Sequence, residues 1–284
     1  MRRIVLFFVL LFLLTSCGRL DTIPHFPAQT PATWLQIQPY AEIHFGGRTI
    51  IFVQPSTSII VYFLGFLTIG VGAYFLCIEN KQRSRLWWGI ALLLWGIGAL
   101  LAGTSYEAFS YTIKCAGRDA CLWTSWWEII YLILSVWSID AMMLAVAWSS
   151  ATGKLRRGLS LYAILNAVLY SILVILGVFL PVKFLISFEF LLMVSAPGVI
   201  AFFVINGWRY ARQKRSIDFI YLGTWIWLGI TIAAYFLYLI SGNTASLWTK
   251  GIWFSENDVL HIGLILWMLY IRVILAPRVT DFTA

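Results

Sequence analysis

"TSIIVYFLGFLTIGVGAYFLCI", residues 57–78, decides the fold class of this chain. The stretch contains no charged side chain, and a helix of about 20 mostly apolar residues is long enough to cross the hydrocarbon core of a membrane. A segment in hydrocarbon must also satisfy its own backbone hydrogen bonds, which a helix does. We therefore predict a transmembrane helix here.

Six further stretches of the same kind follow, so the sequence predicts seven spans. The composition agrees, because 61% of the residues are apolar and only 11% are charged, against about 25% charged residues in a soluble domain. We expect an all-α membrane protein whose residues 57–284 form a seven-transmembrane helix bundle. The predicted spans are residues 57–78, 87–104, 127–149, 159–180, 184–207, 219–240 and 258–276.

The charges of the connecting segments predict the orientation. Eleven Lys or Arg lie in the connections around "ENKQRSR", "GKLRR" and "RYARQKR" and in the C-terminal tail, whereas the other connections and the N-terminal segment hold six. Basic connections stay in the cytoplasm during insertion. We expect an extracytoplasmic N-terminus and a cytoplasmic C-terminus. The net charge of +8 then reflects topology and attraction to membrane lipids, and no nucleic-acid partner is expected.

The first seventeen residues, "MRRIVLFFVLLFLLTSC", have the layout of a secretory signal. Residues 14–17, "LTSC", resemble the bacterial lipobox, which implies cleavage before Cys17 and acylation of its thiol. Residues 1–16 would then be a lipoprotein signal peptide, and the location would be the cytoplasmic membrane of a bacterium. The alternative is an uncleaved N-terminal anchor in which Cys17 is incidental.

Two features are expected outside the membrane. Residues 17–56 form an extracytoplasmic segment, in which "YAEIHFGGRTIIFVQP" alternates around Gly46 and Gly47, a pattern typical of a β-hairpin. Cys115 and Cys121 flank "AGRDA" in the loop between the second and third spans. An extracytoplasmic pair of this kind can oxidise to a disulfide, and two free thiols are the alternative.

Ionisable residues within spans are costly and are candidates for a functional site. Asp258 and His261 lie three residues apart at the start of the seventh span, so they share a helix face. Together with Glu107, they are candidate ligands of one divalent metal, most readily zinc. Glu128 is then the candidate catalytic residue, which orients water or a ligand.

Simpler roles are open for the same residues. Asp258 and Glu128 can each interact with the N-terminal amides of their own helix. Glu107 can lie in water or pair with Lys114. Both sets of roles fit the sequence.

Three more polar residues fall inside the predicted spans. Glu189 lies near the outer end of the fifth span, Asp140 lies toward the cytoplasmic half of the third, and Asn166 lies in the fourth. Intramembrane acids of this kind also occur on proton and cation pathways. A pathway that uses Asp140 is therefore one alternative function.

The ends of three spans carry a resemblance. His261 follows Asn257 by four residues, Glu107 follows Gly103 by four, and Glu128 begins the third span. This layout resembles the CREST superfamily of seven-span membrane hydrolases, which includes alkaline ceramidases and adiponectin receptors. That family has Ser-x3-His, Asp and His-x3-His at these places, and only His261 keeps the family's residue type.

The resemblance implies a metal-dependent hydrolase that acts on lipid-like amides or esters. Its polar pocket would face outward between the second, third and seventh spans, and membrane lipids would be its surroundings or its substrates. A non-enzymatic sensor or partner-binding protein, which uses the N-terminal segment to contact a ligand or an unknown protein, is the other alternative.

Overall fold

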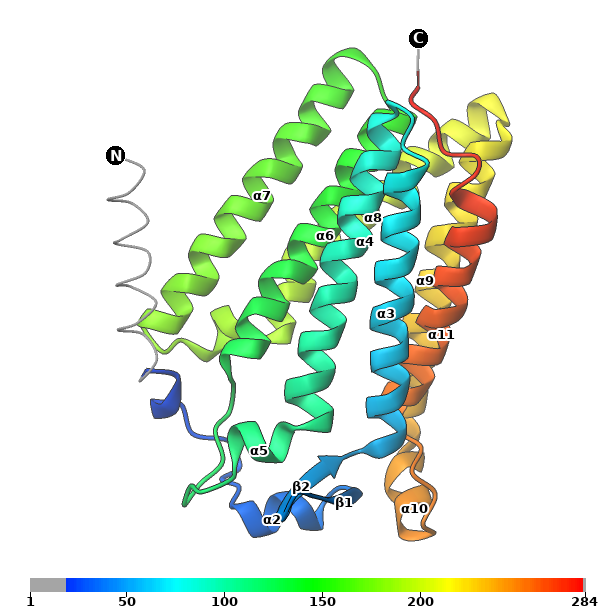
Figure 1. Ribbon diagram of the computed structural model, residues 1–284. Coiled ribbons are helices and arrows are strands. Elements are labelled where there is room, and N and C mark those ends of the chain that lie inside the picture. Colours follow the sequence, from blue (N-terminus) through cyan, green and yellow to red (C-terminus); the bar gives the residue numbers. More distant parts are fainter. Residues whose placement is uncertain (1–18, 283–284) are drawn as a thin grey trace.

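The computed structural model describes residues 19–282, which form a bundle of long helices with small elements at one end (Figure 1). We call this end, which carries residues 19–53, the hairpin end, and the opposite end, which carries residues 276–282, the tail end. The predicted signal peptide and Cys17 lie outside the described residues.

Seven helices are long and apolar enough to cross a membrane, which confirms the predicted seven-span, all-α fold class. The second span continues from α4 into a π-helical turn, η2, and the seventh continues from α11 into another, η4. The helices of the bundle are α3 (Pro55–Cys77), α4 (Arg83–Ala102), η2 (Gly103–Ala108), α6 (Trp126–Ser150), α7 (Gly153–Phe179), α8 (Phe188–Gln213), α9 (Ser216–Ser241), α11 (Glu256–Tyr270) and η4 (Ile271–Leu275).

The remaining elements are short and lie at the hairpin end (Figure 1). The predicted hairpin is present, and Gly46 and Gly47 both take positive φ angles of 56° and 75°, as a two-residue turn requires. The short elements are η1 (Leu20–Thr22), α2 (Pro31–Gln36), β1 (Tyr40–Phe45), β2 (Arg48–Val53), α5 (Ser110–Lys114), η3 (Lys183–Ile186) and α10 (Asn243–Thr249).

Glycines let α3 and α4 approach closely. A Cβ atom added at Gly72 would lie 2.9 Å from the backbone nitrogen of Leu93, and one added at Gly96 would lie 2.8 Å from the carbonyl oxygen of Gly65. Small residues at helix interfaces are typical of membrane bundles, where close backbone packing replaces the hydrophobic effect. This packing fixes the first two spans as a pair.

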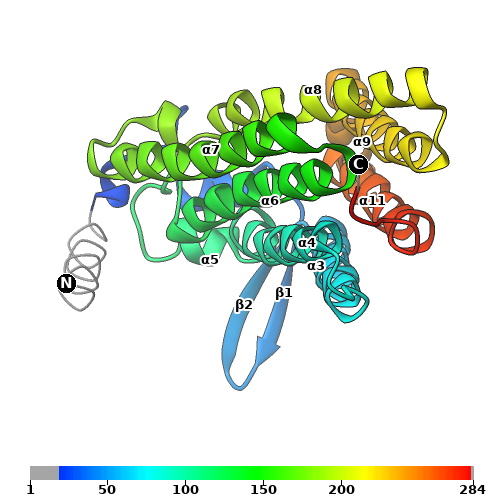
Figure 2. The same ribbon diagram turned by 90° about the horizontal axis from the view of Figure 1, so that it is seen from above.

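The third span is the central helix of the bundle. In α6, 67% of the apolar window is buried, more than in any other span of residues 19–282. Figure 2 shows α6 between α4 on one side and α7 and α8 on the other. The start of α6, and therefore Glu128, is held from several directions.

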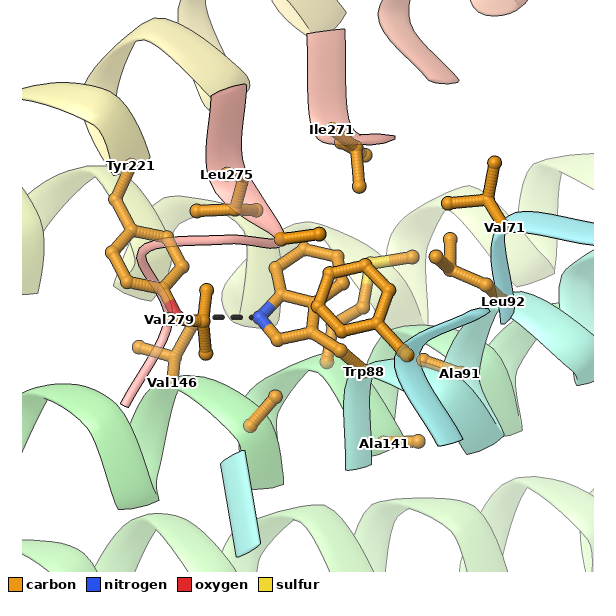
Figure 3. Packing of buried hydrophobic residues seen from close by; sticks show 14 of the residues in the cluster. Val71, Trp88, Ala91, Leu92, Ala141, Val146, Tyr221, Ile271, Leu275 and Val279 are labelled. Carbon is orange, nitrogen blue, oxygen red and sulfur yellow. Dashed lines mark hydrogen bonds between the residues drawn. The ribbon is translucent and has the colours of Figure 1, made fainter. Parts of the chain in front are cut away.

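The core of the tail half is aromatic (Figure 3). The ring of Trp88 stacks on that of Trp225 with a centroid distance of 5.8 Å, and its Nε1 donates to the hydroxyl of Tyr221 at 3.2 Å. Arg209 and Asp218, which lies in the first turn of α9, form a buried ion pair with a 2.9 Å contact. Arg209 Nη2 and Asp218 Oδ2, the other polar atoms of this pair, make no hydrogen bond with any described residue.

The C-terminal tail, residues 276–282, folds back over the tail end. The carboxylate of Asp281 accepts hydrogen bonds from the backbone N–H groups of Arg83 and Ser84, at 2.9 and 2.7 Å. It thereby satisfies amides in the first turn of α4, which otherwise lack partners in the helix. Arg85 adds a bond from Nε to the carbonyl oxygen of Val279 at 2.7 Å.

Candidate functional site

A cavity of about 360 Å³ lies at the hairpin end, where residues 19–38 cross the bundle. We call residues 19–38 the N-terminal strap. The opposite wall comes from η2, α5, the loop before α6, the first turn of α6, and the start of α8. The lining residues are His25, Gln29, Trp34, Ile37, Gln38, Tyr106, Lys114, Trp123, Thr124, Glu128, Ile186, Ser187, Phe188 and Glu189.

A buried ion pair forms part of this wall. Lys114 Nζ lies 2.8 Å from Glu128 Oε1, and the two side chains are only 5% and 2% exposed. Ser105 donates its hydroxyl hydrogen to the same carboxylate oxygen at 2.8 Å. The ammonium group also lies 5.2 and 5.1 Å from the ring centroids of Trp34 and Tyr106. Lys114 thus links the strap to the second and third spans.

The loop between the second and third spans holds the strap in place. Cys115 and Cys121 lie within bonding distance of each other, so the predicted pair can form its disulfide. The backbone N–H of Cys121 donates to the carbonyl oxygen of Gln29 at 2.8 Å. From the other side, Lys183 donates to the carbonyl oxygen of Pro24 at 2.8 Å. The strap is therefore tied to both loops that flank the cavity.

Two polar atoms of the strap lack partners. Gln29 Oε1 and Trp34 Nε1 are buried and make no hydrogen bond with any described residue. Both side chains line the cavity. A buried polar group without a partner costs about 1–3 kcal/mol, and a bound molecule that supplies a donor to Gln29 and an acceptor to Trp34 would remove that cost.

His25 lies beside Trp34, and its surroundings favour the neutral imidazole. Its ring stands edge-on to the ring of Trp34, with 5.7 Å between the centroids. Burial lowers the pKa of His25 below its ordinary value of 6.5, and the positive charges of Lys114 and Lys183 act in the same direction. A neutral imidazole has one nitrogen that donates and one that accepts.

Glu189, one of the predicted polar residues, also lines the cavity. It lies in the first turn of α8, where a negative charge is favoured by the helix dipole. Glu189 is exposed and belongs to none of the ion pairs within residues 19–282. The cavity therefore offers one carboxylate that is not neutralised by a protein cation.

The predicted metal ligand Asp258 is occupied by its own helix end. One carboxylate oxygen, Oδ2, accepts from the backbone N–H of Ser255 at 2.6 Å and from the hydroxyl groups of Ser255 and Thr57 at 3.1 and 3.0 Å. Ser255 and Asp258 form a capping box at the start of α11. These hydrogen bonds are those of a helix cap, which is the simpler role considered for Asp258.

The three predicted ligands do not assemble as a metal centre. Glu107, Asp258 and His261 are buried, and each has one polar atom without a partner among the described residues. Glu107 and Asp258 lie close enough for their charges to interact. Within residues 19–282, however, no three His, Cys, Asp or Glu side chains gather closely enough to hold a metal ion. None of the three lines the cavity.

The predicted polar residues of the third and fourth spans do meet. The side-chain nitrogen of Asn166 donates to both carboxylate oxygens of Asp140, at 3.0 and 3.1 Å. The pair joins α6 to α7, and neither residue lines the cavity. Trp137 strengthens the same contact by donating to the hydroxyl of Ser171 at 2.8 Å.

Sequence reasoning placed Glu128 in the site and named Glu189 only as a polar residue of the fifth span, so it missed most of the cavity. The predicted pocket lay between the second, third and seventh spans. The cavity is instead lined in part by the strap and the fifth span, and no residue of the seventh span lines it. One signal was available. Lys114 is an isolated cation close to Glu128 in sequence, and a buried acid needs such a partner.

No family model matches this chain, and neither a curated protein nor a solved structure matches it. The resemblance to the CREST hydrolases therefore stays a prediction, and the seven-span membrane architecture is what the structure itself establishes.

Proposed function

We propose that the protein is a membrane receptor that binds a small polar molecule in the cavity beneath the N-terminal strap. One observation carries this proposal: Gln29 and Trp34 line the cavity, and each of these side chains has a buried polar atom without a partner among the described residues. The cavity volume of about 360 Å³ lies in the range of small-molecule sites, which is about 300–1,000 Å³.

The chemistry of the lining favours a ligand that both donates and accepts hydrogen bonds. Gln29 Oε1 needs a donor, and Trp34 Nε1 needs an acceptor. The charges of Lys114 and Glu128 largely cancel each other, whereas Glu189 belongs to none of the ion pairs of the described residues. A neutral or singly cationic polar compound therefore matches the site better than an anion.

The position of the cavity suits a sensor. Its wall joins the strap to parts of the second, third and fifth spans. A ligand that bridges Trp34 on the strap and Glu189 on α8 would bind the conformation that holds these parts together. A ligand that binds one arrangement of the helices more tightly than another shifts the population toward that arrangement. With the orientation predicted from the loop charges, the ligand would come from outside the cytoplasm.

A stability screen tests the proposal. The full-length protein, purified in lipid nanodiscs, is heated with polar metabolites that include amines, amino acids, sugars and carboxylates, and its unfolding midpoint is recorded. A ligand that binds only the folded state raises the midpoint. We expect at least one amine or neutral polar compound to do so.

Two tryptophan variants show whether such a compound acts in the cavity. Trp34→Phe removes the unpartnered N–H and keeps an aromatic ring, so it should reduce the stabilisation. Trp253→Phe is the control, because Trp253 lies near the hairpin end, is 43% exposed and does not line the cavity. If no compound stabilises the wild type, or if both variants respond alike, the receptor proposal is wrong.

A further inference from the structure

The β-hairpin has one mostly apolar face and one face on which polar and apolar residues are mixed. Residues paired directly across the two strands point to the same side of the sheet, and successive residues alternate. The mixed face carries the pairs Tyr40–Val53, Glu42–Ile51 and His44–Thr49, and the side chains of His44 and Thr49 are 3.0 Å apart. The other face carries the pairs Ala41–Phe52, Ile43–Ile50 and Phe45–Arg48.

The apolar face is turned toward the bundle. At the base of the hairpin, the ring of Phe52 meets the ring of Phe109, which precedes α5, with 6.1 Å between the centroids. Farther out, the same face has no protein against it. Ile43, Phe45 and Ile50 are 47%, 78% and 37% exposed. Figure 2, which looks along the helices, shows the hairpin projecting sideways beyond α3 and α4.

The hairpin is also held at the level of a membrane boundary. β2 ends at Val53 and α3 begins at Pro55, so only Gln54 separates the strand from the first span. Ile59, four residues into α3, is already 65% exposed on the outside of the bundle, where lipid surrounds a span. An apolar surface that projects sideways at this level faces the lipid headgroups and the upper part of the acyl chains.

We propose that the β-hairpin lies on the membrane surface, with Ile43, Phe45 and Ile50 inserted among the lipids. The occupant of the apolar face is therefore phospholipid. Arg48 lies on this face beside Phe45, at the tip of the hairpin, where its guanidinium group can bind a lipid phosphate. Glu42, His44 and Thr49 face water on the opposite side. This inference rests on the spans and the hairpin, and it is independent of any ligand in the cavity.

Site-directed photocrosslinking tests this arrangement residue by residue. The photoreactive residue p-benzoyl-phenylalanine replaces Ile43, His44, Phe45 or Thr49, one at a time, in the full-length protein in its host membrane. All four positions are exposed in the structure, so the substitutions should leave the fold intact, and an unchanged unfolding midpoint verifies this for each variant. After irradiation, mass spectrometry identifies what is attached to the hairpin.

Phospholipid adducts should form at positions 43 and 45 and be several-fold rarer at positions 44 and 49. The comparison is closely matched, because positions 44 and 45 are adjacent in sequence and differ only in the face that they occupy. Equal lipid labelling on both faces, or its absence from both, would overturn the proposal. So would adducts of positions 43 and 45 with a protein, either a second copy of this chain or another one, because the apolar face would then be a protein interface.

Discussion

Lys114, the last residue of α5, and Glu128, in the first turn of α6, form an ion pair that is almost closed to solvent, with 2.8 Å between Nζ and Oε1. The pair fastens the loop of the predicted disulfide to the central helix of the bundle. It also supplies one wall of the cavity beneath the N-terminal strap.

Breaking this pair should destabilise the protein strongly. Lys114→Met leaves the carboxylate of Glu128 buried without a cation, and removing one member of a buried pair typically costs about 3–5 kcal/mol. We expect a clear fall in the thermal unfolding midpoint. Arg118→Met is the control, because Arg118 pairs with Asp21 at 3.7 Å on the surface and an exposed pair contributes about 0–1 kcal/mol. Equal effects of the two variants would contradict the importance of the buried pair.

Mild acid should loosen the strap through His25. Because the folded protein lowers the pKa of His25 below 6.5, the unfolded chain binds more protons in the window below 6.5, and stability falls as the pH decreases through it. Unfolding midpoints measured from about pH 7 to about pH 5 should fall less steeply in His25→Gln than in the wild type. A wild-type slope that persists in His25→Gln would show that another group is responsible.

The C-terminal tail should stabilise α4 through Asp281. Asp281→Ala removes the acceptor for the amides of Arg83 and Ser84, and loss of such a cap costs about 1 kcal/mol. Asp281→Asn keeps a capping oxygen and should cost less. Asp119→Ala, at an exposed loop position, should change the unfolding midpoint very little. If Asp281→Ala also leaves the midpoint unchanged, the tail does not contribute to stability in this way.

Metal analysis tests the hydrolase predicted from the resemblance. Since Glu107, Asp258 and His261 do not gather as a ligand set, we expect the purified protein to contain no stoichiometric zinc, iron or manganese. A stoichiometric metal that is lost in His261→Ala would contradict this expectation and favour the hydrolase.

The fold class could be predicted because each span is recognisable from its own local sequence. A run of apolar residues long enough to cross a membrane has few alternatives to a helix, so the seven spans needed no knowledge of their packing. The ends were less predictable. The second span begins at Arg83 instead of residue 87, because basic residues at a membrane boundary can continue a helix, and it ends with a π-helical turn that reaches Ala108.

The cavity could not be predicted in the same way, because its walls depend on contacts between distant segments. Lys183 donates a hydrogen bond to the carbonyl oxygen of Pro24, which is 159 positions away in the sequence. The backbone N–H of Cys121 donates to the carbonyl oxygen of Gln29. No local pattern encodes either contact. Conversely, the spacing of Asp258 and His261 was correct for a shared helix face, yet it did not reveal that Ser255 already uses the carboxylate of Asp258.

The central claim of this account is that a small polar molecule binds beneath the N-terminal strap, and an equilibrium titration tests it most directly. The strongest compound from the stability screen is titrated into wild-type protein, into Gln29→Leu and into Gln36→Leu. Gln29 lines the cavity and has a buried oxygen without a partner among the described residues, whereas Gln36 is exposed on α2 and does not line the cavity. Loss of one hydrogen bond of about 1 kcal/mol corresponds to roughly fivefold weaker binding. We predict one site per chain, with such weakening in Gln29→Leu alone. Equal affinity in all three proteins would place the ligand elsewhere and contradict the account.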